Sequence, residues 1–142
     1  HLLGRPTMKL TLPYPPSVNH YWRHFHGRTV ISREGRAFRE NTQALLAQGG
    51  SNGPRKPPSG GRIALAMDAF PPDRRRRDLD NIQKSTLDAL EHAGVYEDDS
   101  QVDLLITRRC DVVPPGRLEI QIETLPLRRC LLCGSTCNPE NN

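Results

Sequence analysis

The segment Asp73–Asn81 holds the residues of this sequence that could most readily do chemistry. It reads Asp-Arg-Arg-Arg-Arg-Asp-Leu-Asp-Asn, so four arginines precede two closely spaced carboxylates. Asp80 and Lys84 are four residues apart, and on a helix this spacing places a carboxylate and an ammonium on one exposed ridge. A second acidic pair, Asp98–Asp99, follows the expected end of that helix at Ala93–Gly94. Only a chain that folds back could bring this pair near the first.

If Asp78, Asp80 and one member of the second pair converge, they predict a metal site. Carboxylates about 4 Å apart repel by roughly 4 kcal/mol per pair at an effective dielectric near 20, which favours a bound cation. Oxygen ligands without a nearby His or Cys suit Mg²⁺ or Mn²⁺. The spacing leaves simpler roles open. Asp78 could be a helix N-cap, Asp80 and Lys84 a surface ion pair, and the arginines a solvated loop.

The motifs of this chain resemble those of the RusA family of Holliday junction resolvases. The similarity extends from about Leu10 to Glu123 and includes the arginine-rich run described above. The segments that carry it are Leu12–Arg23, Arg74–Asn81, Lys84, Ala93–Gly94 and Asp98–Val102.

This resemblance implies a Mg²⁺-dependent nuclease site formed by Asp78, Asp80, Asp99 and Lys84. The three aspartates would be the metal ligands, with Mn²⁺ as an alternative ion, and Asp98 is the weaker candidate. The expected reaction is phosphodiester hydrolysis, in which the metal polarises the scissile phosphate and activates the attacking water. Lys84 would stabilise developing charge. The resemblance also implies four-way DNA junctions as substrate, a role in recombination and repair, and a cytoplasmic, nucleoid-associated protein of bacterial or prophage origin.

Two segments are expected to contact DNA. The arginines of the central run would hold phosphates that flank the cleavage site, with Arg77 best placed because it adjoins the expected ligands. The segment Ser17–His26 interleaves aromatic and basic side chains, which could stack on bases or cover the edge of the core. We expect a mixture, with Trp22 buried. The candidate DNA contacts are Arg74, Arg75, Arg76, Arg77, Asn19, His20 and Arg23.

The length of 142 residues predicts one domain, which we place at residues 8–125. A formal net charge of +4 favours an anionic partner. No apolar run is long enough for a membrane helix, and the N-terminal residues do not resemble a signal peptide, so we expect a soluble protein without a membrane partner. Residues 1–7 are interpreted as an extension or a remnant of expression, and residues 126–142 as a flexible tail.

The hydrophobic patterning predicts an α/β fold, an α+β sandwich with two main helices on one face of a small mixed or antiparallel sheet. The expected strands are 9–12, 28–31, 62–70, 101–113 and 117–125. The first helix is expected over 33–48, capped by Ser32, with Phe38, Leu45 and Leu46 inward. The second is expected over 79–93, with Asp78 at the N-cap position. Its predicted buried stripe consists of Leu79, Ile82, Thr86, Ala89, Leu90 and Ala93.

The C-terminal cysteines offer a second metal hypothesis. Cys130, Cys133 and Cys137 resemble part of a zinc knuckle, but a fourth ligand is missing, so we favour free thiols over zinc.

Two functional alternatives remain open from the sequence. One is a non-catalytic DNA-binding module, and the other is a metal-dependent nuclease acting on other branched DNA. Resolution of a four-way junction requires two matched nicks, and one site per chain can make only one. We therefore expect a two-fold homodimer, although the sequence does not identify its interface.

Overall fold

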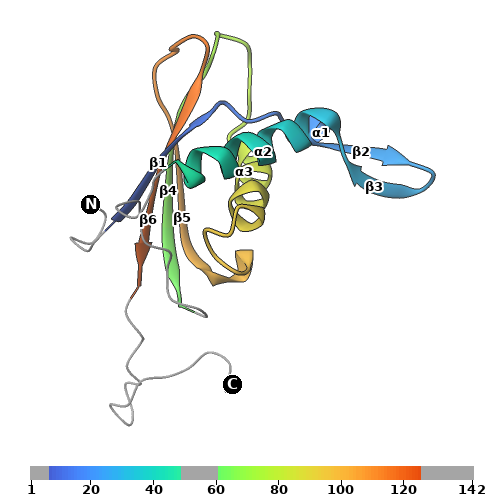
Figure 1. The fold of residues 1–142 in the computed structure, drawn as a ribbon. Coiled ribbons are helices and arrows are strands. Elements are labelled where there is room, and N and C mark those ends of the chain that lie inside the picture. The colour runs from blue at the N-terminus through green and yellow to red at the C-terminus, as the bar shows by residue number, and fades with distance from the viewer. Residues whose placement is uncertain (1–6, 49–60, 126–142) are drawn as a thin grey trace, which may run out of the picture.

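The computed structural model describes residues 7–48 and 61–125, which form one sheet, two main helices and a projecting hairpin (Figure 1). The helices lie on one face of the sheet, and the hairpin extends away from the body. The elements in chain order are β1 (Thr7–Pro13), α1 (Val18–Tyr21), β2 (Trp22–Phe25), β3 (Arg28–Ile31), α2 (Arg33–Ala47), β4 (Ile63–Phe70), α3 (Asp80–His92), the 3₁₀ helix η1 (Asp99–Gln101), β5 (Val102–Arg109) and β6 (Arg117–Thr124).

The main sheet is mixed, which is one of the two arrangements expected from the sequence. Its strand order is β1-β6-β4-β5, and β1 and β4 both pair with β6 in antiparallel orientation. β4 and β5 are parallel, because α3 carries the chain back across the sheet between them. The loop that precedes α3 therefore lies at one end of the sheet and η1 lies at the other.

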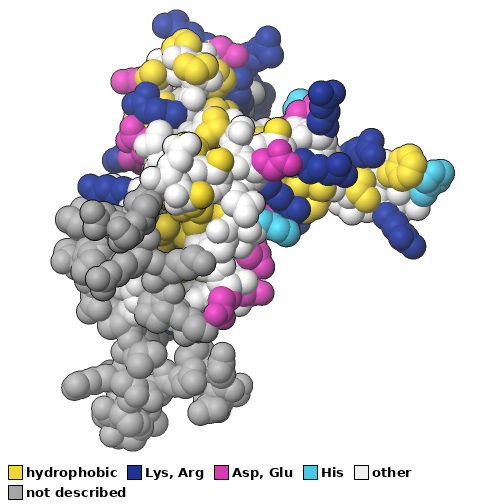
Figure 2. Space-filling view, in the orientation of Figure 1, with side chains coloured by type: hydrophobic (Ala, Val, Ile, Leu, Met, Phe, Trp, Pro, Cys, Tyr) yellow, Lys and Arg dark blue, Asp and Glu magenta, His cyan; other side chains and the backbone are white. Residues whose placement is uncertain are grey.

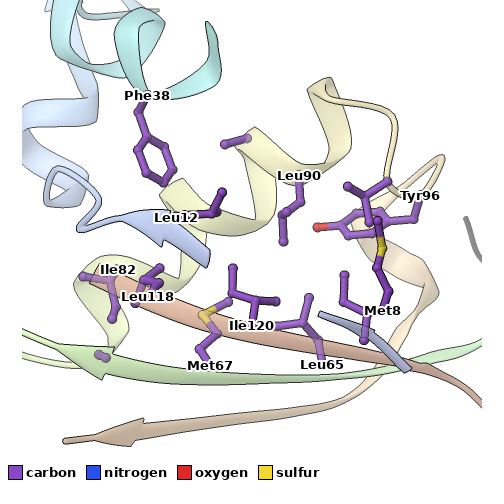
Figure 3. Packing of buried hydrophobic residues seen from close by; sticks show 14 of the residues in the cluster. Met8, Leu12, Phe38, Leu65, Met67, Ile82, Leu90, Tyr96, Leu118 and Ile120 are labelled. Atoms are coloured by element: carbon purple, nitrogen blue, oxygen red, sulfur yellow. The ribbon is translucent and has the colours of Figure 1, made fainter. Parts of the chain in front are cut away.

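Alternation along β4 builds the core. Ile63, Leu65, Met67 and Ala69 point to one face and are fully buried. Asp68 points to the other face and pairs with Arg108 of β5, with Nη2 and Oδ2 2.8 Å apart. Figure 3 shows the sheet and helix side chains meeting in one layer. The buried residues of α3 are Ile82, Ser85, Thr86, Ala89 and Leu90, whereas Leu79 and Ala93 are only partly buried.

The predicted start of α2 is confirmed. The Ser32 hydroxyl accepts a hydrogen bond from the backbone N–H of Gly35 at 3.0 Å, as an N-cap does. Phe38 is buried and Leu46 is partly buried against the core, also as predicted. The inward placement of Leu45 is wrong, since this side chain is 39% exposed. Consecutive helical residues differ by about 100° in direction, so Leu45 lies at the margin of the buried stripe.

The largest difference from the sequence prediction is in Ser17–His26, where no helix or strand was expected. It contains the short helix α1 and strand β2, and β2 pairs with the predicted strand β3. His26 and Gly27 both have positive φ, of 48° and 72°, which is the conformation of a two-residue hairpin turn. Histidine is a less common residue at such a turn than Asn or Asp, so the residues at this turn are only a weak signal for a hairpin.

The strand expected over 101–113 is shorter than predicted at both ends. Residues 99–101 form η1, and β5 ends at Arg109. Beyond it, the backbone N–H of Cys110 bonds to the Ala69 carbonyl at 2.8 Å, and Gly116 completes the predicted turn with a φ of 93°. No helix in the described ranges is long and apolar enough to cross a membrane. The cysteines of the tail lie outside the described residues.

Candidate active site

The two aspartates that precede and open α3 are both exposed. The helix begins at Asp80, and its N-cap position is occupied by Leu79, so the prediction that Asp78 caps the helix is wrong. Asp78 contributes its backbone carbonyl instead, which accepts from Asn81 N–H at 3.2 Å. Neither aspartate side chain has a hydrogen bond or ion pair with another residue in the described part of the chain. Both carboxylates are thus available to an external ligand.

Arg77 is the most firmly positioned of the four arginines. Its Nη1 donates to Asp73 Oδ1 at 2.6 Å, and its guanidinium lies 5.7 Å from the centre of the Tyr14 ring. The Arg77 carbonyl accepts from the Arg109 guanidinium. The Arg77 hydrogen bond, aided by the backbone N–H of Arg75, lowers the pKa of Asp73 to about 2. The remaining side chains, Arg74, Arg75 and Arg76, are exposed.

Lys84 lies one helical turn after Asp80 on the outer ridge of α3, as its spacing predicted, and both side chains are exposed. The two do not form an ion pair. Hydrogen bonds fix the helix on both sides of this ridge. Gln83 Nε2 donates to Thr107 Oγ1 of β5 at 2.9 Å, and Ser85 Oγ donates to the Pro16 carbonyl at 3.1 Å. The ammonium therefore projects from a firmly held helix.

Asp98 and Asp99 have different roles at the other end of α3. Asp98 is the N-cap of η1, since its Oδ1 accepts from Ser100 N–H at 2.7 Å and its own N–H donates to Gln101 Oε1 at 3.2 Å. The Asp99 side chain is exposed and lies near Glu91 and Tyr96. Because Asp98 is used for capping, Asp99 is the more available carboxylate of the pair.

The surroundings of Asp99 are strongly acidic. Partial burial, with the nearby Asp99 carboxylate as the next cause, raises the pKa of Glu91. Burial and the same carboxylate raise the pKa of Tyr96, whose hydroxyl donates to the Leu87 carbonyl at 2.7 Å. Figure 2 shows Asp and Glu side chains gathered near η1, and Lys and Arg side chains at the opposite end of the body. The two ends of α3 therefore carry opposite charge.

The three candidate metal ligands do not converge within one chain. Glu91 is eleven positions after Asp80 on α3, which corresponds to roughly 16 Å along the helix axis. Asp99 is held beside Glu91, whereas Mg²⁺ requires ligand oxygens at about 2.0–2.1 Å. Over the described ranges, no group of three or more His, Cys, Asp or Glu side chains is arranged to hold a metal ion. A single chain therefore supplies two separated parts of the expected site.

The candidate DNA contacts of the N-terminal segment are exposed. Asn19 and His20 are on α1, and Arg23 is on β2 of the projecting hairpin. His20 Nδ1 lies 3.2 Å from Ser17 Oγ. Trp22 is only partly buried overall, although its indole Nε1 is buried, and the Arg39 guanidinium lies 5.7 Å from the centre of its ring.

Sequence reasoning missed a polar cluster that joins α1, α2 and α3. The Tyr21 hydroxyl donates to Asp88 Oδ2, and Arg39 donates to the same oxygen from Nε at 2.9 Å. His92 Nε2 lies 3.7 Å from the other Asp88 oxygen. The signal was absent because Tyr21 and Asp88 are 67 residues apart in sequence.

Comparison with known proteins identifies the family. Residues 13–123 match the family model described as Endodeoxyribonuclease RusA. Proteins named crossover junction endodeoxyribonuclease RusA from Shigella sonnei strain Ss046 and Escherichia coli strain K12 are 42% and 41% identical over 116 residues, covering 82% of this chain and 93% of each relative. The protein of that name from Enterobacteria phage HK97 is 43% identical over 117 residues, covering 82% and 94%.

The matched region contains the whole of α3, the arginine-rich loop before it and η1 after it. All four residues of the expected nuclease site lie inside this region. Family membership confirms what the sequence motifs indicated, and it assigns the chain to enzymes that hydrolyse phosphodiester bonds in DNA. The chain belongs to the RusA family of endodeoxyribonucleases.

Proposed function

We propose that this protein is a Mg²⁺-dependent endonuclease that resolves four-way DNA junctions during recombination and repair. The names of its relatives, which include proteins of phages 82 and HK97, support junction cleavage and a prophage origin. The chain itself supports hydrolysis at a phosphate, because two available carboxylates adjoin an arginine-rich loop and a lysine. Carboxylate oxygens suit a hard divalent cation, and guanidinium groups suit phosphate.

The observation that carries this proposal is the separation of Asp80 from Asp99 along α3. One chain does not fit a metal site, but its two parts lie at opposite ends of one exposed helical ridge. A two-fold axis across that ridge would run two copies of α3 antiparallel. Asp78 and Asp80 of each chain would then face Asp99 of the partner subunit. Each dimer would hold two equivalent sites, as two matched nicks require.

Charge also favours this antiparallel arrangement. The loop before α3 carries four arginines, whereas the far end of the helix carries Glu91, Asp98 and Asp99. A parallel contact would place like charges together, whereas an antiparallel contact places each basic end against an acidic one. We therefore propose the outer ridge of α3, around Leu87, as the centre of the dimer interface, with Lys84 at its margin beside Asp80.

Each group of the chain would then have its own role in the reaction. Asp78, Asp80 and Asp99 of the partner subunit would hold the cation, which when bound supplies charge neutralisation at the phosphate and activation of water. Lys84 would stabilise the charge that develops on the phosphate oxygens. Arg77, fixed by Asp73 and Tyr14, would orient the neighbouring phosphate, and the other three arginines would hold the flanking backbone.

A mixed-dimer experiment tests the shared site directly. Chains carrying Asp80→Asn and Asp99→Asn are given different tags, co-expressed and purified through both tags. If sites are shared, neither homodimer cuts, but the mixed dimer regains one complete site and nicks a four-way junction in one strand. The matched control is a mixed dimer in which one chain carries Asp78→Asn and the other carries Asp80→Asn. In this dimer each of the two sites has lost one ligand. Complementation by the control pair, or none by the first pair, would contradict the shared site.

The substrate is tested with the wild-type protein on labelled four-way junctions, flaps and linear duplexes, in Mg²⁺, Mn²⁺ or EDTA. We expect paired cuts in the junction that require the metal. Junction binding without cutting would support a non-catalytic DNA-binding module. Equal cutting of flaps would support a nuclease for branched DNA in general.

A further inference from the structure

The tip of the β2–β3 hairpin exposes a phenylalanine that the core does not use. Phe25 is 54% exposed, more than any other large hydrophobic side chain in the described ranges. It lies at the end of β2, next to the His26–Gly27 turn, and the hairpin projects from the body (Figure 1). Figure 2 shows a hydrophobic group at the far end of this projection, beside histidine and flanked by basic side chains. An exposed ring at such a position is typical of a contact site.

Strand register places two arginines on the same face as this ring. Arg23 is two residues before Phe25, and Arg28 pairs directly with Phe25 across the hairpin. The Arg23 guanidinium lies 5.4 Å from the centre of the phenyl ring. His26 packs its ring edge-on against the same phenyl, with ring centres 4.2 Å apart. Residues 22–31 contain no Asp or Glu. The face therefore combines a flat apolar group with uncompensated positive charge.

The base of the hairpin is rigidly mounted. Tyr21, directly before β2, is fully buried and is hydrogen-bonded to Asp88 of α3. The Ser32 N–H, directly after β3, donates to the Tyr21 carbonyl at 2.9 Å. Gly35 allows this close packing, because a Cβ there would lie 2.5 Å from the Tyr21 carbonyl oxygen. The tip is thus held in a fixed direction relative to the helix that carries Asp80.

We propose that Phe25 is a stacking wedge that inserts beside a base at the branch point of the DNA, with Arg23 and Arg28 on the adjoining phosphates. The inference rests on the proposed function. Bases at a branch point have an interrupted stack, so opening a base step there costs less than within a duplex. An aromatic side chain stacks on any base, and arginines add attraction to the backbone. A second copy of this face is a poorer partner, because its arginines would repel.

The test uses a four-way junction with 2-aminopurine beside the crossover and a linear duplex of the same sequence. Binding and fluorescence are measured with Ca²⁺ in place of Mg²⁺, so that cleavage does not occur. We expect the wild type to unstack the probe and raise its fluorescence. Phe25→Leu, which keeps an apolar side chain but removes the ring, should lose this signal and bind the junction about tenfold more weakly, with duplex binding unchanged. Phe25→Trp should retain both effects.

Leu45→Ala is the matched control, because it removes an exposed apolar side chain from α2, away from the hairpin. It should behave as the wild type. If Phe25→Leu binds the junction and unstacks the probe as the wild type does, the wedge is refuted while the proposed nuclease function stands. Conversion of the protein to a monomer by Phe25→Leu in light scattering would also refute it, since Phe25 would then be a subunit contact. A wild type that neither binds nor cuts junctions would refute the proposed function itself.

Discussion

The two ends of α3 present carboxylates in opposite settings. At the N-terminal end, Asp78 and Asp80 are exposed beside an arginine-rich loop, and their carboxylates are not engaged with other described residues. At the C-terminal end, Asp99 lies near Glu91, Tyr96 and a capping aspartate. One end is electropositive with available ligands, and the other is electronegative and crowded. Each end has some of the carboxylate ligands that a divalent cation requires, and in the proposed dimer a second chain supplies the others.

The two ends of α3 also distinguish aspartates that cap a helix from aspartates that could bind a metal ion. Acidic residues near helix ends commonly serve as caps, and Asp98 does so at η1. Asp78 was expected to do the same at α3, but its side chain has no such role. Residues that do not stabilise their own helix end are the stronger candidates for function.

Removing a ligand from either end should have equal consequences for cleavage. Asp80→Asn and Asp99→Asn should each reduce junction cleavage by more than roughly 100-fold. A loss of about 100-fold is the upper range for a residue that only orients a metal ligand, and a ligand itself should matter more. Junction binding should be unchanged or tighter, because a negative charge near phosphate is removed. Single-turnover cleavage and gel-shift titrations measure the two effects.

Two carboxylate controls sharpen the comparison of the ends. Asp98→Asn should remain active, since it alters a cap rather than a ligand, and Glu40→Gln should match the wild type because it lies on the exposed side of α2. If Asp80→Asn cleaves junctions at nearly the wild-type rate, Asp80 is not a metal ligand. If Asp98→Asn is inactive and Asp99→Asn is active, Asp98 is the metal ligand and Asp99 is not.

The lysine on the ridge should affect turnover more than affinity. Lys84→Ala should lower the cleavage rate by about 100-fold if the ammonium acts on the transition state, with junction affinity changed less than about twofold. Lys84→Arg should recover part of the rate, because it restores the charge with different geometry. Equal losses of rate and affinity would make Lys84 a phosphate contact instead.

The middle of α3 should contribute to stability rather than to catalysis. Asp88→Ala leaves the Arg39 guanidinium and the Tyr21 hydroxyl without their shared acceptor and should lower the free energy of unfolding by about 1–3 kcal/mol. Urea unfolding measures this loss. Arg36→Ala, an exposed change on the same helix as Arg39, is the control and should have little effect. A loss of cleavage without a loss of stability would show that Asp88 belongs to the site.

The smallest effect is expected at the crowded end. The pKa of Glu91 is raised above its usual 4.5 in the folded protein, so the native state holds a proton that the unfolded chain has released. Stability should therefore fall as pH rises through the folded-state pKa. Glu91→Gln should lack this fall and be the more stable protein at pH 8 in EDTA. Thermal melts at pH 5 and pH 8 compare the two, and an unchanged pH dependence would contradict the assignment.

Much of the fold followed from patterns within single segments. The strand at 62–70 was expected from its patterning, and the Ser32 cap located the start of α2. The hairpin did not follow, because its turn uses a histidine in a conformation that sequence patterns associate with other residues. The exposure of Leu45 did not follow either, because it depends on how far the sheet and α3 extend beneath α2.

For the site, the sequence by itself determined the chemistry of the groups and their order along the chain. It placed Asp80 and Lys84 on one ridge, because helical periodicity fixes neighbours three or four residues apart. Only the tertiary structure decided that Asp99 lies at the far end of that helix and that Asp88 turns inward to Tyr21 and Arg39. Distances between elements depend on packing among residues far apart in sequence, and no local pattern encodes them.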